Sequence, residues 1–402
     1  MTAEGTFTLK QAAERVGVTP STLTRWAKTG VIPEAKATAN GWTPAAVAHA
    51  RIVARLRERG HSLDTIRKAS AEGKLAYGFI EDLFPVPKTP RSLDDVAEQT
   101  GLETPLIERI WVSCGLPTSE LEQLTDEDVQ ALQYIASVLA AGFPLVAFLQ
   151  LARVYGQTVS QIADAETRVF HIYVHEPLMR EGVPGLQMAE EMEHLARDLL
   201  PLASPIMDYL HQRFLQHFVE QDLVGHMELE LEQDLDLGRL KVAIAFCDLA
   251  GYTRFTEEEG EEEALSYVEL FVDAVTDTLP DDARLIKTIG DEVMVVGTDA
   301  AALTDWAVGF GALFGEERPP VRIGVHYGVA LYRDGDYYGR DVNVAARIVA
   351  RSRGGEVLIT DTVAETIAQP GHLVLEDLGE VKLKGFDEPR RLIRAKRREP
   401  DG

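Results

Sequence analysis

Cysteine is nearly absent from this chain of 402 residues, which contains only Cys114 and Cys247. Both cysteines lie within apolar segments, and their spacing fits neither a disulfide framework nor a metal-binding motif. No uninterrupted apolar run reaches the roughly 18 residues of a transmembrane helix, and Met1–Gly5 lacks the charged and apolar regions of a signal peptide. We therefore expect a cytoplasmic protein without a membrane span.

Positive charge is scarce and unevenly distributed. The chain has 40 Lys+Arg against 65 Asp+Glu, for a net charge of −25, which argues against nucleic acid as a partner of the whole surface. Residues 1–75 contain 12 basic and 6 acidic side chains, a net of +6, which leaves 28 against 59 and a net of −31 for the remainder. The N-terminal segment is therefore predicted to be a separate unit with its own electrostatic character.

Residues 1–75 show the helix order of a winged helix-turn-helix. An amphipathic helix, Phe7–Val18, precedes a second short helix, Thr22–Thr29, with Pro20 placed as a first-turn residue. A polar wing after Pro33 and the run WTPAAVAHARIVARLRERGHSLDTIRKA complete a segment that resembles the MerR-type DNA-binding domain. That resemblance implies that the second helix reads the DNA major groove through Ser21, Thr22, Thr24, Arg25 and Lys28. The alternative is a dimerisation or regulatory module that binds no DNA.

A second copy of this pattern begins 84 residues later. The run RSLDDVAEQTGL, Arg91–Leu102, corresponds to Phe7–Val18, and the sequences that follow also correspond. This copy has lost the basic residues and is acidic, so phosphate would be repelled. We interpret it as a protein-contact or ligand-binding module.

Helical periodicity dominates from Gln150 to Glu228. Pro201 and Pro205 are expected to kink or restart a helix there. Six of the ten histidines lie in this segment, and they are either polar residues of helix surfaces or proton sensors. The acidic run MELELEQDLDLGR follows and is predicted to be a linker.

The segment 90–224, with the helix LPLASPIMDYL, resembles the regulatory domain of pH-responsive mycobacterial adenylyl cyclases. The resemblance implies a domain that dimerises, holds a catalytic half inactive and can accommodate a fatty acid in its helical core.

Two lone aspartates mark the C-terminal third as a candidate cation site. Asp248 ends the apolar strand Leu240–Ala250, and Asp291 interrupts the hairpin LIKTIGDEVMV together with Lys287. Isolated charges in apolar strands are expensive to bury, and carboxylate oxygens suit magnesium or manganese. The alternative is a pair of strand-end carboxylates that form turn hydrogen bonds. The element order β-α-β-β-α-β predicts a ferredoxin-like α+β sandwich.

Three motifs in this region, FCDLAGYT, IKTIGDEVM and DYYGRDVNVAARI, resemble those of the class III nucleotidyl cyclases. The resemblance covers 240–397 and implies roles for residues at matching positions. It implies two divalent ions, Mg²⁺ or Mn²⁺, on Asp248, Asp291 and the Leu249 carbonyl, adenine contacts from Lys287 and Asp336, transition-state stabilisation by Asn343 and Arg347, and triphosphate contacts from Arg333 and Lys384. In that family the metal aspartates come from one subunit and the adenine and transition-state residues from its partner, which implies a head-to-tail homodimer.

The sequence thus predicts a multidomain protein with an all-α N-terminal half and an α+β catalytic domain. The predicted divisions are a MerR-like winged helix-turn-helix at 1–75, a helical regulatory and dimerisation domain at 90–224, a linker at 225–239 and a cyclase domain at 240–397. The predicted activity is that of a soluble adenylate cyclase, which converts ATP to cyclic AMP and pyrophosphate. The alternative is a MerR-like DNA-binding regulator whose cyclase-like domain only senses nucleotide, but every chemical position of the three motifs is filled.

Overall fold

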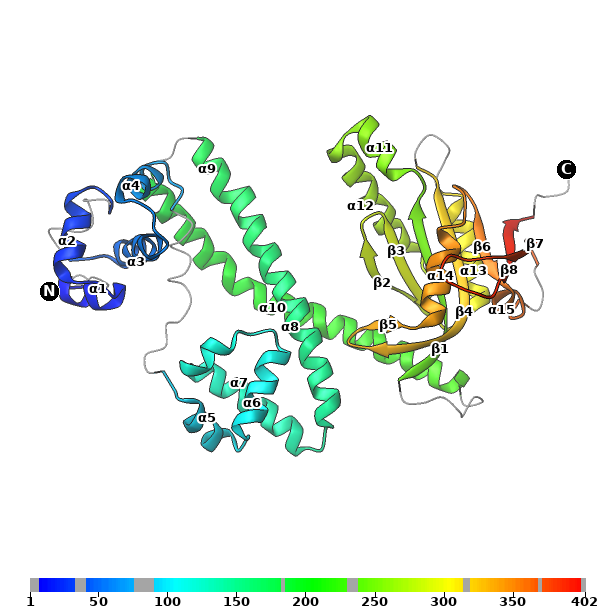
Figure 1. Cartoon of the computed structure of the whole chain (residues 1–402), viewed down its shortest axis with the longest axis horizontal. Coiled ribbons are helices and arrows are strands. Elements are labelled where there is room, and N and C mark those ends of the chain that lie inside the picture. Colours follow the sequence, from blue (N-terminus) through cyan, green and yellow to red (C-terminus); the bar gives the residue numbers. More distant parts are fainter. Residues whose placement is uncertain are drawn as a thin grey trace. The chain divides into compact units, whose positions relative to one another are not determined.

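The computed structural model divides the chain into two compact units, Met1–Gln212 and Arg213–Gly402. Each unit has its own cores, and helix α10 (Gly185–Leu229) contributes residues to both units (Figure 1). The structure describes residues 7–32, 41–75, 90–181, 185–229, 238–313, 319–367 and 371–398. The predicted wing after Pro33 lies outside these residues.

The first unit begins with four helices around one small core. They are α1 (Leu9–Val16), α2 (Pro20–Lys28), α3 (Pro44–Glu58) and α4 (Leu63–Ala71). Oxygen-bearing side chains cap each helix, and Gly17 takes the left-handed conformation with φ of 73° that lets the chain turn between α1 and α2. Leu23, Trp26 and Trp42 are buried in the core. A single β-bridge between Phe7 and Trp42 brings the start of α1 beside that of α3.

The next segment, where the sequence predicts a second copy, has a core of its own. It contains α5 (Leu93–Thr100), α6 (Thr104–Ser113), the 3₁₀ turn Thr118–Glu122 and α7 (Asp126–Ala140). A bridge between Arg91 and Leu124 again joins the residues before its first and last helices. Trp111 on α6 is buried, as Trp26 is on α2.

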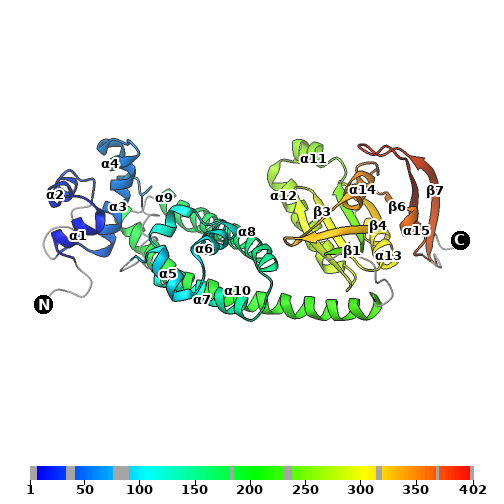
Figure 2. The same cartoon turned by 60° about the horizontal axis from the view of Figure 1, so that its bottom comes forward.

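Long helices continue the chain as the periodicity predicted. They are α8 (Leu145–Phe170), the π-helical turn His171–His175, α9 (Glu176–Arg180) and α10 (Gly185–Leu229). Pro201 and Pro205 were predicted to kink or restart a helix; the restart is wrong, because α10 runs through both, and the kink stays a prediction (Figure 2). A proline removes one backbone donor without ending a long helix when the neighbouring turns remain bonded. The predicted linker is also shorter at its start, since α10 extends to Leu229, and residues 230–237 lie outside the described part.

The second unit is built on one mixed sheet. Its strands are β1 (Arg239–Leu249), β2 (Ala283–Ile289), β3 (Glu292–Gly297), β4 (Val321–Arg333), β5 (Asp336–Tyr338), β6 (Val357–Thr360), β7 (Leu373–Val381) and β8 (Arg390–Arg397). Its other helices are α11 (Tyr252–Glu259), α12 (Glu261–Thr278), α13 (Ala300–Gly311), α14 (Arg340–Val349) and α15 (Asp361–Ala364). The strand order is β2-β3-β1-β4-β6-β8-β7, with β5 paired to β4. The part β2-β3-β1-β4 is antiparallel, in the order predicted for a ferredoxin-like sandwich.

Alternate residues of β1 pack against helices on opposite faces of this sheet. Ala243, Ala245 and Cys247 contribute to a core with α12 and α13. Val242, Ile244 and Phe246 contribute to a second core under α14, which Figure 1 shows lying across the sheet. Because both faces of β1 are buried, a polar side chain at its C-terminal end is surrounded mainly by protein and little by water.

Candidate active site

The acidic end of β1 lies between two strands that also bear charges. Asp248 is opposite Glu292 on β3 and opposite Arg322 on β4. The Arg322 Nε atom donates a hydrogen bond of 2.8 Å to Asp248 Oδ2, and Asp248 is only 8% exposed. The Leu249 N–H points to the Asp291 carbonyl at 3.4 Å, which holds the turn between β2 and β3 beside the end of β1. Asp248 and Leu249 from one predicted motif and Asp291 from another therefore lie together.

The electrostatics of this group favour a cation. Burial, followed by the charge of Asp248 and a hydrogen bond with it, raises the pKa of Asp291. Burial also raises the pKa of Glu292 to about 7, with further contributions from Asp248 and Asp291. Arg322 is the cation that opposes both shifts. Three crowded carboxyl groups with one guanidinium would be relieved by a second positive charge.

The donor set fits a hard divalent ion that is only partly enclosed by protein. Across the described part of the chain, no three histidine, cysteine or acidic side chains converge into a full ligand set. Magnesium is commonly bound through one or two carboxylates, with waters and substrate phosphates as the remaining ligands. Asp248 and Asp291 supply carboxylate oxygens of this kind.

Lys287 and Asp336 form a second polar pair. Lys287 lies on β2, next to an irregularity in the pairing with β3, and its Nζ atom forms an ion pair with Asp336 Oδ2 on β5. Bulges of this kind redirect side chains. Asp336 Oδ1 also accepts the N–H of Tyr337 at 2.8 Å, and the Tyr337 hydroxyl accepts a bond from Arg284. The structure therefore brings together the two residues predicted to contact adenine.

Asn343 and Arg347 lie one turn apart on α14, and both side chains are exposed. The buried residues Val344, Ala345 and Ile348 fix the opposite side of the helix against the sheet. Asn343 also lines a cavity of about 460 Å³ with Arg340 and the turn Gly385–Glu388. Both predicted transition-state residues are therefore presented outward.

The two predicted triphosphate residues are less closely tied to this arrangement. Arg333 ends β4, with its Nε atom 3.7 Å from a carboxylate oxygen of the neighbouring Asp334. Lys384 is exposed in the turn between β7 and β8, directly before Gly385, which lines the cavity beside Asn343.

Arg322 is a site residue that the sequence analysis missed. It stands in the run VRIGVHYG as a lone charge in an apolar strand, which is the same signal that identified Lys287 and Asp248. Its importance emerges only because β4 pairs with β1 in the register that places Arg322 opposite Asp248.

Comparison with known proteins identifies two domains. Residues 35–219 match the model of the adenylate cyclase regulatory domain, and residues 239–394 match the adenylate and guanylate cyclase catalytic domain. The regulatory match begins inside the segment predicted to be MerR-like. The chain is thus an enzyme with a cyclase catalytic domain preceded by a regulatory domain.

The chain is similar to known cyclases over much of its length. The chain is 27% identical over 358 residues to a pH-sensitive adenylate cyclase of Mycobacterium tuberculosis, covering 87% of this chain and 88% of the relative. It is 29% identical over 276 residues to an adenylate cyclase of Streptomyces coelicolor, covering 67% and 70%. Among solved structures, the adenylyl cyclase CyaB from P. aeruginosa aligns with a TM-score of 0.38 and 23% identity, over 42% of this chain and all of that one. No helix in the part of the chain that the structure describes is long and apolar enough to cross a membrane.

Proposed function

We propose that this chain, with its cyclase catalytic domain, converts ATP to 3′,5′-cyclic AMP and pyrophosphate in a homodimer. The observation that carries the proposal is the placement of three side-chain sets within one such domain. Asp248 at the end of β1 lies beside Asp291 in the turn between β2 and β3. The Lys287–Asp336 pair joins β2 to β5, and Asn343 and Arg347 face outward from α14. The relatives named as adenylate cyclases support ATP as the substrate.

Asp248, Asp291 and the Leu249 carbonyl would hold two divalent ions, Mg²⁺ or Mn²⁺. Such ions activate the attacking ribose hydroxyl and neutralise phosphate charge. Arg322 pairs with Asp248, and its guanidinium would be suited to bind the triphosphate if Asp248 were bound to a metal ion.

Lys287 and Asp336 would read the edge of adenine. The ammonium group can only donate hydrogen bonds, while the carboxylate accepts them, so the pair offers both halves of a complementary pattern. A base that cannot form a hydrogen bond with one of these two side chains leaves that side chain unpaired. Such unpaired polar groups discriminate strongly between substrates.

Asn343 and Arg347 would meet the charge that develops on the α-phosphoryl oxygens as the 3′-oxygen attacks and pyrophosphate leaves. A planar guanidinium held on a rigid helix is suited to this role. Arg333 and Lys384 would contact the triphosphate from the ends of their strands.

The outward position of Asn343 and Arg347 supports a site completed by a second subunit. In a head-to-tail homodimer, α14 of one chain would face the acidic end of β1 in its partner. Two equivalent sites would then form, each with metal-binding residues from one chain and adenine and transition-state residues from the other.

The test is turnover of Mn²⁺-ATP by the purified full chain, with cyclic AMP and pyrophosphate measured separately. We expect both products in equal amounts, and none from Asp248→Ala. An absence of turnover by the full chain and by a fragment 213–402, which spans the second compact unit, would refute the enzymatic proposal.

Regulation by the N-terminal half is a further part of the proposal. Within the second unit, α10 packs beside the start of β2, because Arg284 lies over the Phe218 ring at 5.5 Å and the Gln221 side chain donates to the Asp281 carbonyl. Comparing the full chain with fragments 213–402 and 238–402 would separate the effect of this α10 segment from that of the preceding residues. Faster turnover by either fragment would identify the removed part as inhibitory.

The regulatory signal would be a proton or an apolar ligand. The histidines motivate the first, since His175 on the π-helical turn is buried and its Nε2 lies 3.2 Å from the Gly73 carbonyl. A fatty acid among the helices is the second. The test is the ratio of the activity of the full chain to that of fragment 238–402. A ratio that changes neither with pH nor with added oleate would exclude both signals.

DNA binding by residues 1–75 is the second candidate function. Ser21, Arg25 and Lys28 are exposed on α2, while Leu23 and Trp26 anchor its other side. Thr22 and Thr24 are engaged locally, with the Thr24 hydroxyl donating to the Pro20 carbonyl. Gel shifts with genomic fragments at low and moderate salt would test this function and show whether any binding is only electrostatic.

A further inference from the structure

The catalytic domain contains a buried histidine to which the proposed reaction assigns no role. His326 lies on β4 and is 3% exposed. Its Nδ1 atom is 2.9 Å from the Thr360 hydroxyl on β6, and its Nε2 atom is 3.4 Å from Asp341 Oδ1 at the start of α14. The ring therefore connects two strands of the sheet to the helix that carries Asn343 and Arg347.

Asp341 reaches the sheet through a gap left by a glycine. Its Oδ2 atom accepts the N–H of Val329 at 2.8 Å. A Cβ on Gly328 would lie 2.3 Å from that same oxygen, so a side chain there would exclude the carboxylate. The polar contact with His326 is the largest cause that holds the pKa of Asp341 below its usual value, followed among the favourable causes by the Val329 N–H.

The contact between the two side chains is polar but long. Among the described side chains, His326 Nε2 is one of three buried polar atoms that lack a hydrogen bond of normal geometry. A carboxylate can only accept, so the proton on Nε2 is directed at Asp341. A buried donor at this distance favours any movement that brings α14 closer to β4.

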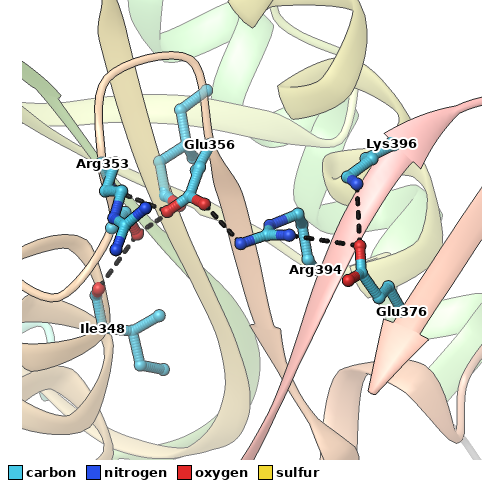
Figure 3. A network of polar contacts seen from close by, with 8 residues as sticks. Ile348, Arg353, Glu356, Glu376, Arg394 and Lys396 are labelled. Carbon is cyan, nitrogen blue, oxygen red and sulfur yellow. Dashed lines mark hydrogen bonds and ion pairs between the residues drawn. The ribbon is translucent and has the colours of Figure 1, made fainter. Parts of the chain in front are cut away.

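The far end of α14 is fixed separately. The Ser352 hydroxyl lies 3.3 Å from the Ile323 carbonyl on β4 and 3.1 Å from the Ile348 carbonyl on α14. The next residue, Arg353, donates its N–H to Glu356, which also binds Arg394 (Figure 3). Arg394 and Lys396 both bind Glu376, so this network joins β8 to β7. With one end held in this way, the contact at Asp341 sets the remaining freedom of the helix. Asn343 is only two residues from Asp341, about 3 Å along the helix axis.

We propose that His326 and Asp341 form a positioning pair that sets where α14 presents Asn343 and Arg347 to the substrate. The inference rests on the proposed cyclase function but names residues outside its catalytic set. Neither side chain touches the reacting groups, so the pair acts through α14. Loss of this pair should lower kcat. The KM for ATP should stay nearly unchanged, because Lys287 and Asp336, which would bind adenine, lie on β2 and β5.

The test compares His326→Leu, His326→Gln and Asp341→Asn in the full chain with Mn²⁺-ATP. Leucine removes both nitrogens, whereas glutamine keeps a donor that can face Asp341. Asparagine fits the same space but can offer an N–H where His326 Nε2 needs an acceptor. We expect kcat to fall about 10- to 100-fold for His326→Leu and Asp341→Asn, with partial rescue by glutamine. The double variant should be no worse than the poorer single variant, because the two residues act as a unit.

His372→Gln is the matched control. His372 also forms an ion pair with an aspartate, Asp305, but on exposed side chains away from α14. Its substitution should leave kcat unchanged. If His326→Leu does not fold, Asp341→Asn carries the test, since the Asp341 side chain is 26% exposed. Retention of kcat within about threefold by folded Asp341→Asn, or a parallel loss of kcat and ATP affinity, would overturn the proposal.

Hydrogen–deuterium exchange provides a readout that does not depend on turnover. Asp341→Asn should speed exchange of the α14 amides while those of α13 stay protected. Unchanged protection of α14 would refute the positioning pair even if the enzyme is active. A wild-type chain without turnover would refute the proposed function alone, because exchange would still report on the pair.

Discussion

Arg322 and Asp248 face each other on paired strands, with Arg322 Nε 2.8 Å from Asp248 Oδ2. A predicted metal ligand is therefore already neutralised by a residue of its own chain. A divalent ion held by Asp248 would have to compete with this guanidinium, so we expect metal binding to depend on Arg322.

Removing that guanidinium should strengthen metal binding while weakening catalysis. For Arg322→Gln we expect Mn²⁺ alone to raise the melting temperature at lower concentration than in the wild type. The repulsion between Arg322 and a cation about 4 Å away would be worth about 1 kcal/mol in water and about 4 kcal/mol near a protein surface. Cyclic AMP production should nevertheless fall, because the triphosphate loses a partner. Arg391→Gln, which breaks the exposed Arg391–Asp377 pair, is the control; weaker Mn²⁺ binding by Arg322→Gln would contradict the competition.

A mixture of inactive chains should regain activity if the site is shared between subunits. Asp248→Ala removes the metal side and Arg347→Ala the transition-state side. A mixed dimer contains one site that has lost both and one that is intact. Random pairing of equal amounts predicts about one quarter of the wild-type activity. A mixture as inactive as its components, with exchange of subunits shown by tagged chains, would argue against the shared site.

Breaking the Lys287–Asp336 pair should reduce selection for adenine. Lys287→Met removes a charged donor, and an unmade hydrogen bond to a charged group costs about 2 kcal/mol, or about thirtyfold. We expect kcat/KM for ATP to fall by that order and kcat/KM for GTP to fall less. Measuring both nucleotides for Lys287→Met, Asp336→Asn and the double variant would show whether the residues are coupled. Equal losses for ATP and GTP would mean that the pair does not read the base.

The first helical core should lose stability in acid through His49. Burial lowers the pKa of this residue from 6.5 to about 4, although its Nε2 bonds the Val31 carbonyl at 3.0 Å and opposes the shift. The unfolded chain binds the proton first, so the stability contribution is complete above pH 6.5 and is lost as pH falls toward 4. The full effect is about 3 kcal/mol.

Thermal melts between pH 7 and 4.5 would measure this dependence. His49→Gln keeps a donor for Val31 and should flatten the pH dependence of the transition that includes residues 7–75. His61→Gln, at an exposed position of the same module, should leave it unchanged. An identical pH dependence in His49→Gln and the wild type would show that another group is responsible.

The sequence determined the catalytic domain in some detail, because local patterns report directly on strands. Alternating and continuous apolar runs located β1, β2, β3 and β4, and charges inside them marked Asp248, Lys287 and Asp291. Burying a lone charge is so unfavourable that its presence in a strand indicates a specific use. Helical periodicity likewise predicted α8 and α10.

Only the tertiary structure decided which charges meet. Strand register pairs Arg322 with Asp248, which is 74 positions away in the sequence. The contact between β2 and β5 pairs Lys287 with Asp336, 49 positions away. At such separations the sequence carries no local signal that two residues are close. The gap at Gly328 that admits Asp341 also depends on how α14 packs on β4. The same holds for Pro201 and Pro205, where the sequence predicted a kink or a restart and the structure has one helix through both residues. Local preferences fix which elements form, but contacts between elements fix their chemistry.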